Sequence, residues 1–393
     1  MKKRLFVITA VGLCIILFFV GVAGAMTTKK ELNMSGIRES LDKRFTRMMD
    51  KRDFSGAAYA VYKGSVVFDG GRGNANEDEA CSTDNAFGVA SVSKQFTAAS
   101  IMQLYDRGKL DIKDRLSKYF PDYRYGDFIT VEQLLYQRSG IPDFAVANID
   151  DMINIICYTN DDTYERLIIP DKASAKENRD TIREYFLSKD LLFQPGEMYD
   201  YSDSNFSLLA EIVSQVTGME YHDYVRENIF KPLSMNHSSF IDDFEEPFSA
   251  SIASPDLEEF GRDYFEVKGL EYGCGDVLTT PKDLYRWYRG LVSDKVVKKD
   301  TFAMMSQNYS NEDEMGYGYG LMVSDESDSK VLFHYGYIPS YYSSIFYIPE
   351  YDYFQVVIAN RYGNEENGDP HELAADMMKY AGSVIGLTLR DIE

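Results

Sequence analysis

The stretch that decides the fold reads Phe87-Gly88-Val89-Ala90-Ser91-Val92-Ser93-Lys94-Gln95-Phe96-Thr97-Ala98-Ala99-Ser100-Ile101. Its apolar residues recur at helical spacing as far as Leu104, and Gly108 is a typical stop, so a helix is predicted to open at Ser91. Residues three apart share a helix face, which lets the Lys94 amine reach the Ser91 hydroxyl. Since a serine alcohol needs a base beside it to be a nucleophile, the pair is a candidate catalytic unit. The alternative is that Ser91 only caps the helix.

The Ser-x-x-Lys spacing is not specific by itself, because it occurs three times in this chain. Ser40 and Lys43 lie on a charged helix face, and Ser327 and Lys330 lie in an acidic loop. Only Ser91 is set among small apolar residues at a helix start. The free N–H groups of a helix N-terminus can stabilise an oxyanion, which favours Ser91 as the reactive serine.

A second segment supplies a candidate tyrosine. It reads Pro195-Gly196-Glu197-Met198-Tyr199-Asp200-Tyr201-Ser202-Asp203 and precedes an apolar helical face that ends at Gly218. A tyrosine hydroxyl can act as general base or acid, and a nearby ammonium is expected to favour its phenolate form. Tyr201 is the candidate and Tyr199 its rival, while ordinary core packing is the alternative for either ring.

A third segment, Phe333-His334-Tyr335-Gly336-Tyr337, follows Val331 and Leu332 and is predicted to be a strand. His334 is expected to change charge near neutral pH and to hydrogen-bond a substrate carboxylate or Tyr201. Gly336 is expected to let substrate lie along the strand. A purely structural histidine is the alternative.

In this order the three segments resemble those of the serine β-lactamases and penicillin-binding proteins, and most closely the class C β-lactamase-like branch of D,D-peptidases and esterases. The resemblance covers about residues 55–360. It implies an α/β (α+β) fold of the β-lactamase/transpeptidase type. An antiparallel sheet from both chain ends would be flanked by helices, with a mostly helical lobe inserted at roughly residues 110–290. It also implies an acyl-enzyme mechanism on an amide or ester, with Ser91, Lys94 and Tyr201 as catalytic residues.

The resemblance assigns further residues to the site. The backbone N–H groups of Ser91 and Tyr337 would form an oxyanion hole, His334 and Gly336 would contact substrate, and Gln95 is a weaker candidate.

Asp203 stands where the family usually has Asn. An ionised Asp can only accept hydrogen bonds, which argues against efficient hydrolysis of acylamino β-lactams. We expect Asp203 to pair with Lys94 or to recognise a donor on the substrate.

Other motifs and the composition exclude several functions. There is no Gly-x-Ser-x-Gly elbow and no phosphate-binding loop, and the four histidines lack metal-ligand spacing, so no metal or cofactor is expected. The formal net charge of −22 would repel nucleic acid. The expected partner is a small-molecule or peptide substrate, which includes D-amino-acid peptides, esters and β-lactams.

The N-terminus predicts the location of the protein. Residues 2–4 are basic and precede an uncharged, apolar run at 5–26, which is either a signal peptide or a membrane anchor. Residues 27–33 would be a tether and 34–393 the hydrolase domain. Both alternatives place the domain outside the cytoplasm, secreted or membrane-anchored, where peptidoglycan is within reach. A non-catalytic binder or sensor of cell-wall peptides or β-lactams, with the same cleft, is the alternative function.

The remaining pattern predicts individual elements. Strands are expected at 57–62, 66–69, 331–335, 343–348 and 353–358, and helices at 36–49 and 372–385, the last covering the sheet. Between the two groups of strands the chain is expected to be mostly helical.

Overall fold

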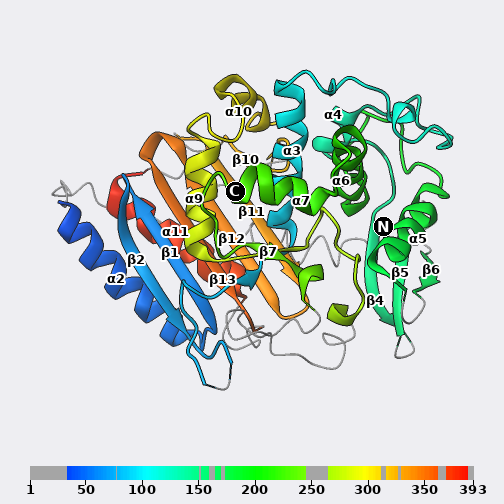
Figure 1. Cartoon of the computed structure of the whole chain (residues 1–393). Coiled ribbons are helices and arrows are strands. Elements are labelled where there is room, and N and C mark those ends of the chain that lie inside the picture. The colour runs from blue at the N-terminus through cyan, green and yellow to red at the C-terminus, as the bar shows by residue number, and fades with distance from the viewer. Residues whose placement is uncertain are drawn as a thin grey trace.

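The computed structural model describes residues 33–76, 78–149, 152–158, 164–169, 173–244, 264–310, 316–325, 329–361 and 369–387. Within these ranges, strands from both chain ends form one antiparallel sheet in the order β2-β1-β13-β12-β11-β10-β9 (Figure 1). Its strands are β1 (Gly56–Tyr62), β2 (Ser65–Arg72), β9 (Gly316–Tyr317), β10 (Met322–Ser324), β11 (Val331–Ile338), β12 (Tyr341–Ile348) and β13 (Tyr353–Ala359). The predicted fold class and the five predicted strands are confirmed.

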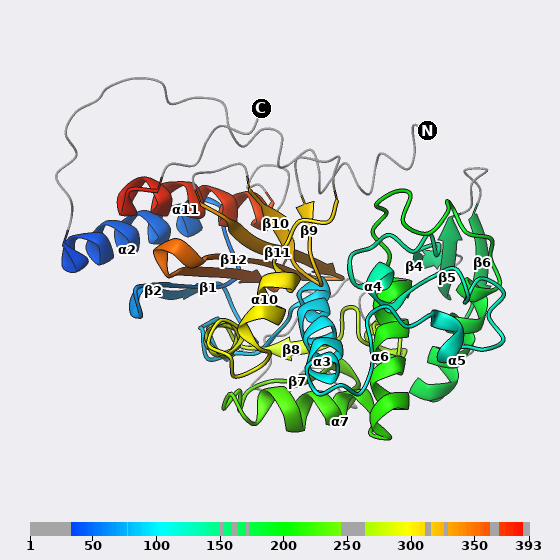
Figure 2. The ribbon, with the colours of Figure 1, turned by 90° about the horizontal axis from the view of Figure 1, so that it is seen from above.

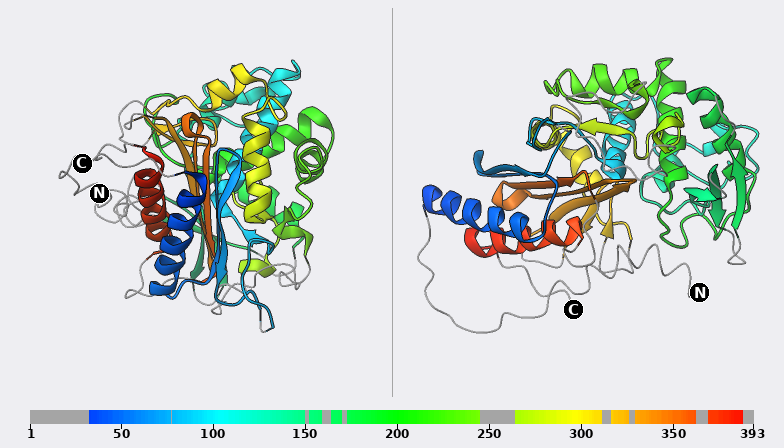
Figure 3. Two further views of the ribbon diagram at one scale, coloured as in Figure 1. Left: turned by 90° about the vertical axis from the view of Figure 1, so that its left-hand side faces the viewer. Right: turned by 90° about the horizontal axis from the view of Figure 1, so that it is seen from below.

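Helices cover both faces of this sheet. On one face α2 (Met34–Lys51) and α11 (Pro370–Ile385) lie side by side, and α9 (Pro281–Leu291) packs on the other (Figures 2 and 3). All residues of β1, β12 and β13 are buried, as expected for strands covered on two sides. The predicted N-terminal and C-terminal helices are therefore confirmed, and the C-terminal one covers the sheet.

The second lobe carries most of the remaining helices. The remaining described helices are α3 (Lys94–Asp106), α4 (Val131–Leu135), α5 (Ala175–Leu187), α6 (Asp203–Thr217), α7 (Tyr221–Val225) and α10 (Lys299–Met305). Of these, α10 lies beside the main sheet and not in the lobe (Figure 1). The helix predicted after Tyr201 is α6, and it ends at Gly218, whose φ of 71° is left-handed. A glycine adopts this conformation without the steric penalty that other residues meet.

The lobe also contains strands, which the expectation of a mostly helical middle of the chain did not include. A separate antiparallel sheet consists of β4 (Phe144–Ile149), β5 (Met152–Tyr158) and β6 (Tyr164–Ile168). Residues 153–157 are all buried, and the isoleucine-rich run Ile153-Asn154-Ile155-Ile156 is typical of a strand covered on both faces. A smaller sheet of β3 (Phe87–Gly88), β8 (Val277–Thr279) and β7 (Ser239–Phe240) joins the lobe to the main sheet.

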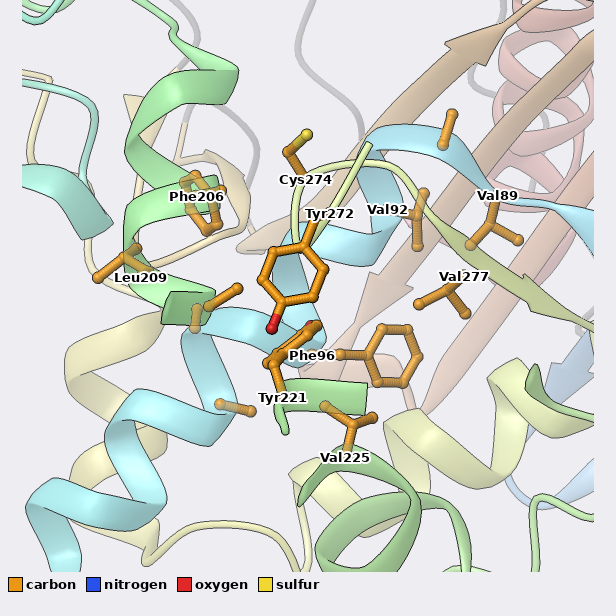
Figure 4. Close-up of a cluster of buried hydrophobic side chains, with 14 of the residues drawn as sticks. Val89, Val92, Phe96, Phe206, Leu209, Tyr221, Val225, Tyr272, Cys274 and Val277 are labelled. Carbon is orange, nitrogen blue, oxygen red and sulfur yellow. The ribbon is translucent and has the colours of Figure 1, made fainter. Parts of the chain in front are cut away.

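The two parts share one hydrophobic core around α3, whose residues from Lys94 to Leu104 are all buried. Figure 4 shows Phe96 of α3 among Tyr221 and Val225 of α7 and Val277 of β8. On its other side the Phe96 ring lies 4.4 Å from the ring of Trp287 in α9. The helix that follows Ser91 is therefore held by both parts of the molecule.

The N-terminal predictions lie outside the described residues, which begin at 33. Among the helices that the structure describes, none combines the length and the apolar character that crossing a membrane requires.

Candidate active site

Ser91 lies on a short 3-10 turn, Ala90–Ser93, which is called here the Ser91 turn. The sequence predicts a helix that opens at Ser91, but the α-helix begins at Lys94. Ala90 has a φ of +47°, a left-handed conformation that is strained for a residue with a Cβ. The Ser93 hydroxyl accepts a hydrogen bond of 3.0 Å from the Val277 amide, which ties the turn to β8. The tie holds the partly exposed Ser91 at the junction of sheet and lobe.

Lys94 contacts Ser91 as the spacing predicts. Its Nζ donates to Ser91 Oγ at 3.0 Å and to the carbonyl oxygen of Cys274 at 2.8 Å. The same nitrogen forms an ion pair of 2.5 Å with Asp203 Oδ1, and its side chain is fully buried. The structure therefore brings Ser91, Lys94 and Asp203 together.

The charge of Lys94 follows from these contacts. Burial acts to lower the pKa of the Lys94 amine, but the Asp203 carboxylate outweighs it, and the pKa is raised above its ordinary value. Lys94 is thus an ammonium at neutral pH and cannot accept the Ser91 proton while it keeps its own. Asp203, which touches the same nitrogen, is placed to take the proton of Lys94.

Tyr201 lies over the same ammonium, with Lys94 Nζ 4.9 Å from the centre of its ring. Burial and then the Asp203 charge raise the pKa of the phenol well above its usual value, and the Ser91 hydroxyl offsets this only in part. The expected phenolate is therefore not favoured, and Tyr201 is a proton donor. Its hydroxyl is buried, and no hydrogen bond of normal geometry reaches it from the described part of the chain. Tyr199, the rival, packs against Tyr317 with ring centres 5.8 Å apart.

His334 is next to Tyr201, with ring centres 6.3 Å apart, but it is almost fully buried. Its Nδ1 is 2.6 Å from the Tyr335 carbonyl oxygen, which can only accept, so Nδ1 carries the proton. Its Nε2 accepts from the Tyr317 hydroxyl at 3.3 Å. Burial and then Lys94 lower the pKa of the imidazole to about 3. The expected titration near neutral pH was wrong: His334 is neutral and carries no charge to bind a carboxylate.

Gly336 has a packing role in the structure, and its expected contact with substrate stays a prediction. A Cβ at this position would lie 2.3 Å from the Val89 carbonyl oxygen and 2.5 Å from Ser343 Oγ. The missing side chain therefore lets β11 pack closely against the residues that precede Ser91.

Tyr337 is exposed, and its ring lies 4.9 Å from that of Tyr342. β10 pairs only with residues 331–333 of β11, which leaves the Tyr337 end of that edge without β10 beside it. A role of the Tyr337 amide in an oxyanion hole stays a prediction.

Gln95 is not part of the site. Its Oε1 accepts from Trp287 Nε1 at 2.9 Å, its Nε2 donates to the Tyr288 hydroxyl at 3.3 Å, and it is fully buried. Successive helix residues are turned by about 100°, so a neighbour of Lys94 points to another side of α3. Gln95 joins α3 to α9 in the core.

Two acidic residues near Asp203 were missed by sequence reasoning. Asp143 Oδ1 accepts the Asp203 backbone N–H at 2.7 Å, and burial and then Asp203 raise the pKa of Asp143 well above its usual value. Glu271 accepts from the Tyr264 hydroxyl, and burial and then Asp203 raise its pKa to about 7. Nothing in the local sequence of Glu271 indicates this role, because it depends on a loop that returns to Lys94.

The ligand atoms of Asp203, Glu271 and Cys274 all lie within 4.8 Å of one another. Such a group could hold a cation in principle, but the Lys94 ammonium already contacts Asp203 and is the resident positive charge. The arrangement of nucleophile, buried ammonium, phenol and carboxylate is suited to acyl transfer, in which a serine oxygen attacks a carbonyl.

The fold and this site define a serine acyl-transfer protein of the penicillin-binding type. A family model described as Beta-lactamase matches residues 41–377, and the chain belongs to that family. It is therefore a member of a family of serine acyltransferases and hydrolases.

The comparisons with individual proteins agree. The chain is 26% identical over 326 residues to penicillin-binding protein 4* of Bacillus subtilis, which covers 77% of this chain and 67% of that protein. The octameric penicillin-binding protein homologue from Pyrococcus abyssi has a TM-score of 0.70 and 24% identity over 88% of this chain and 77% of that one. D-amino acid amidase from Ochrobactrum anthropi SV3, complexed with L-phenylalanine amide, has a TM-score of 0.68 and 20% identity over 88% of this chain and 99% of that one. These structures share the fold.

Proposed function

We propose that this protein is an exported serine hydrolase that cleaves an amide or ester through an acyl-enzyme on Ser91. The observation that carries the proposal is the contact of Lys94 Nζ with both Ser91 Oγ and Asp203 Oδ1, at 3.0 and 2.5 Å. Few structural roles require a buried lysine to hold a partly exposed serine hydroxyl and a carboxylate at once. The family, to which the chain belongs, supports the same chemistry.

The geometry suggests the route of the protons. Lys94 passes a proton to Asp203 as it takes the proton of Ser91, and the serine oxygen forms a bond to the substrate carbonyl carbon. Tyr201, which keeps its own proton, donates it to the leaving amine or alcohol and regains one from the Lys94 and Asp203 pair. Water then attacks the acyl group, and the same groups move its proton, so that one acid and one amine or alcohol are released.

A labelling experiment tests this function. The full chain in detergent is incubated with a fluorophosphonate and, separately, with a labelled penicillin, and the adduct is located by mass spectrometry. We expect a fluorophosphonate adduct on Ser91 that is absent in Ser91→Ala and unchanged in Ser40→Ala, a matched control with the same Ser-x-x-Lys spacing. Folded protein without any adduct would contradict the proposal.

The raised pKa of Lys94 favours one second candidate, a binder or sensor that becomes acylated without turnover. If Asp203 keeps the proton that it takes from Lys94 during acylation, the deacylating water has no base. A single burst of product equal to the amount of protein, with no steady state after it, would identify this function.

Export and a substrate from the cell wall are part of the proposal. Export is supported by the basic and then apolar residues 2–26, and D-amino-acid substrates by the D-amino acid amidase and penicillin-binding proteins that share the fold. Protease added to intact cells should digest the domain if it is outside, whereas complete protection would contradict export.

A further inference from the structure

Asp203 is a partly exposed carboxylate of the site that touches the catalytic lysine. Its Oδ1 pairs with Lys94 and its backbone N–H is bonded to Asp143. Its side chain is 25% exposed, whereas that of Lys94 is fully buried, and the contacts with Lys94 and Asp143 engage Oδ1 and the backbone N–H and leave the second carboxylate oxygen for another partner. A carboxylate at a catalytic site with a free acceptor oxygen can bind a cationic or N–H group of the substrate.

The charges around Asp203 favour a cation. Lys94 is the single positive partner of Asp203 in the described residues, and a carboxyl oxygen of Glu271 lies within 4.8 Å of a carboxyl oxygen of Asp203. Burial and then the Asp203 charge raise the pKa of Glu271 to about 7, so that Glu271 is partly ionised at neutral pH and adds to the negative charge beside Asp203. His334, on the strand beside the site, is neutral and adds no positive charge. The site therefore attracts an ammonium and repels a carboxylate.

The distances place such an ammonium next to the scissile bond. Ser91 Oγ and Asp203 Oδ1 both touch the same Lys94 nitrogen, so the two side chains line one small space. In an amide or ester of an α-amino acid, the α-nitrogen is only two bonds from the carbonyl carbon. A carbonyl carbon in contact with Ser91 thus brings its α-nitrogen within a few ångströms of Asp203.

We propose that the site selects substrates with a free, protonated α-amine beside the scissile carbonyl, which Asp203 binds through its open oxygen. This inference rests on the proposed hydrolase function and names its substrate class as amides and esters of free amino acids or of peptides with a free N-terminus. An N-acylated substrate presents a neutral N–H and an acyl oxygen that would face the carboxylate. N-acyl peptides and penicillins are then the poorer substrates.

Matched substrates test this. D-alanine p-nitroanilide and its N-acetyl derivative share the leaving group and differ only at the α-nitrogen, and the ratio of their kcat/KM values is measured. A charge-assisted hydrogen bond predicts about a 10-fold to 100-fold preference for the free amine. Asp203→Asn should reduce the ratio about 10-fold or more, and the ratio cancels any loss of activity that follows from the altered Lys94 contact. Glu227→Gln, at an exposed carboxylate that pairs with Lys231, is the control and should leave the ratio unchanged.

A binding measurement separates the two ways to fail. Calorimetry on Ser91→Ala, which cannot react, compares D-alaninamide with N-acetyl-D-alaninamide. Tighter binding of the free amine that Asp203→Asn removes supports the inference even if neither nitroanilide is cleaved, in which case the proposed hydrolase function has failed. Equal kcat/KM values or equal binding of the two members of a pair would overturn the inference and leave a serine hydrolase of other specificity.

Discussion

A buried phenol beside a carboxylate keeps its proton, and Tyr201 is in this situation, since burial and Asp203 raise its pKa. As the proton donor to the leaving group, it should be required for catalysis but not for folding. We expect Tyr201→Phe to lower kcat by about 100-fold to 10,000-fold, the usual contribution of a general acid, with little change in Tm. Tyr199→Phe, two residues away, is the control and should change kcat by less than about 3-fold. The opposite result for the two variants would make Tyr199 the catalytic tyrosine.

Glu271 should make the stability of the protein depend on pH. Burial and Asp203 raise its pKa from the ordinary carboxyl value to about 7 in the folded state. A group whose folded pKa is raised contributes stability that is present at low pH and lost as the pH rises through the folded value. We therefore expect Glu271→Gln to gain in Tm relative to the wild type between pH 5 and pH 8. Glu227→Gln, an exposed control, should not show this trend, and a parallel pH profile for wild type and Glu271→Gln would contradict the assignment.

At the scale of elements, the contact of β11 with the Ser91 turn depends on the absence of a side chain at Gly336. A Cβ there would be 2.3 Å from the Val89 carbonyl oxygen, so either the strand or the turn must move. We expect Gly336→Ala to destabilise the protein by about 1–3 kcal/mol and to lower kcat, because overpacked sites shift their neighbours. Chemical unfolding and steady-state kinetics measure the two effects.

Gly70→Ala in β2 is the matched control for this strand position. Its Cβ would meet only the Phe68 ring, at 2.9 Å, and a side chain can turn away where a backbone carbonyl cannot. We expect a smaller loss of stability and unchanged kcat. If Gly336→Ala were as active as Gly70→Ala, the close packing of β11 would not position Ser91.

At the scale of the whole molecule, the covering helices were predictable because each buries one regular apolar face, and the strands of the main sheet because their short apolar runs are bounded by turn residues. The strands β4 to β6 were missed because a short, continuously buried run such as residues 153–157 cannot be told from a buried helix segment by periodicity alone. In the site, Ser91 and Lys94 were predictable since one helical turn relates them. Glu271 was not, and Gln95 was misplaced, because both depend on how distant segments pack around α3.

That packing makes a last prediction about the cooperativity of folding. Phe96 of α3 touches Trp287 of α9, with ring centres 4.4 Å apart, and Phe230 on the lobe side, at 5.6 Å. Trp287 is the single tryptophan of the chain and is fully buried, so its fluorescence reports this junction. If sheet and lobe share one core, the fluorescence and the far-ultraviolet circular dichroism should follow a single denaturant transition.

Phe96→Ala should shift both signals together and lower the free energy of unfolding by about 3–5 kcal/mol, the usual loss for a buried phenylalanine. Phe128→Ala, at an exposed position, is the control and should change it by less than about 0.5 kcal/mol. Two separate transitions, with the fluorescence change confined to one, would mean that the lobe and the sheet fold independently. In that case Ser91 and Tyr201, which come from either side of the junction, would be held together by the local contacts of Lys94 and not by a common core.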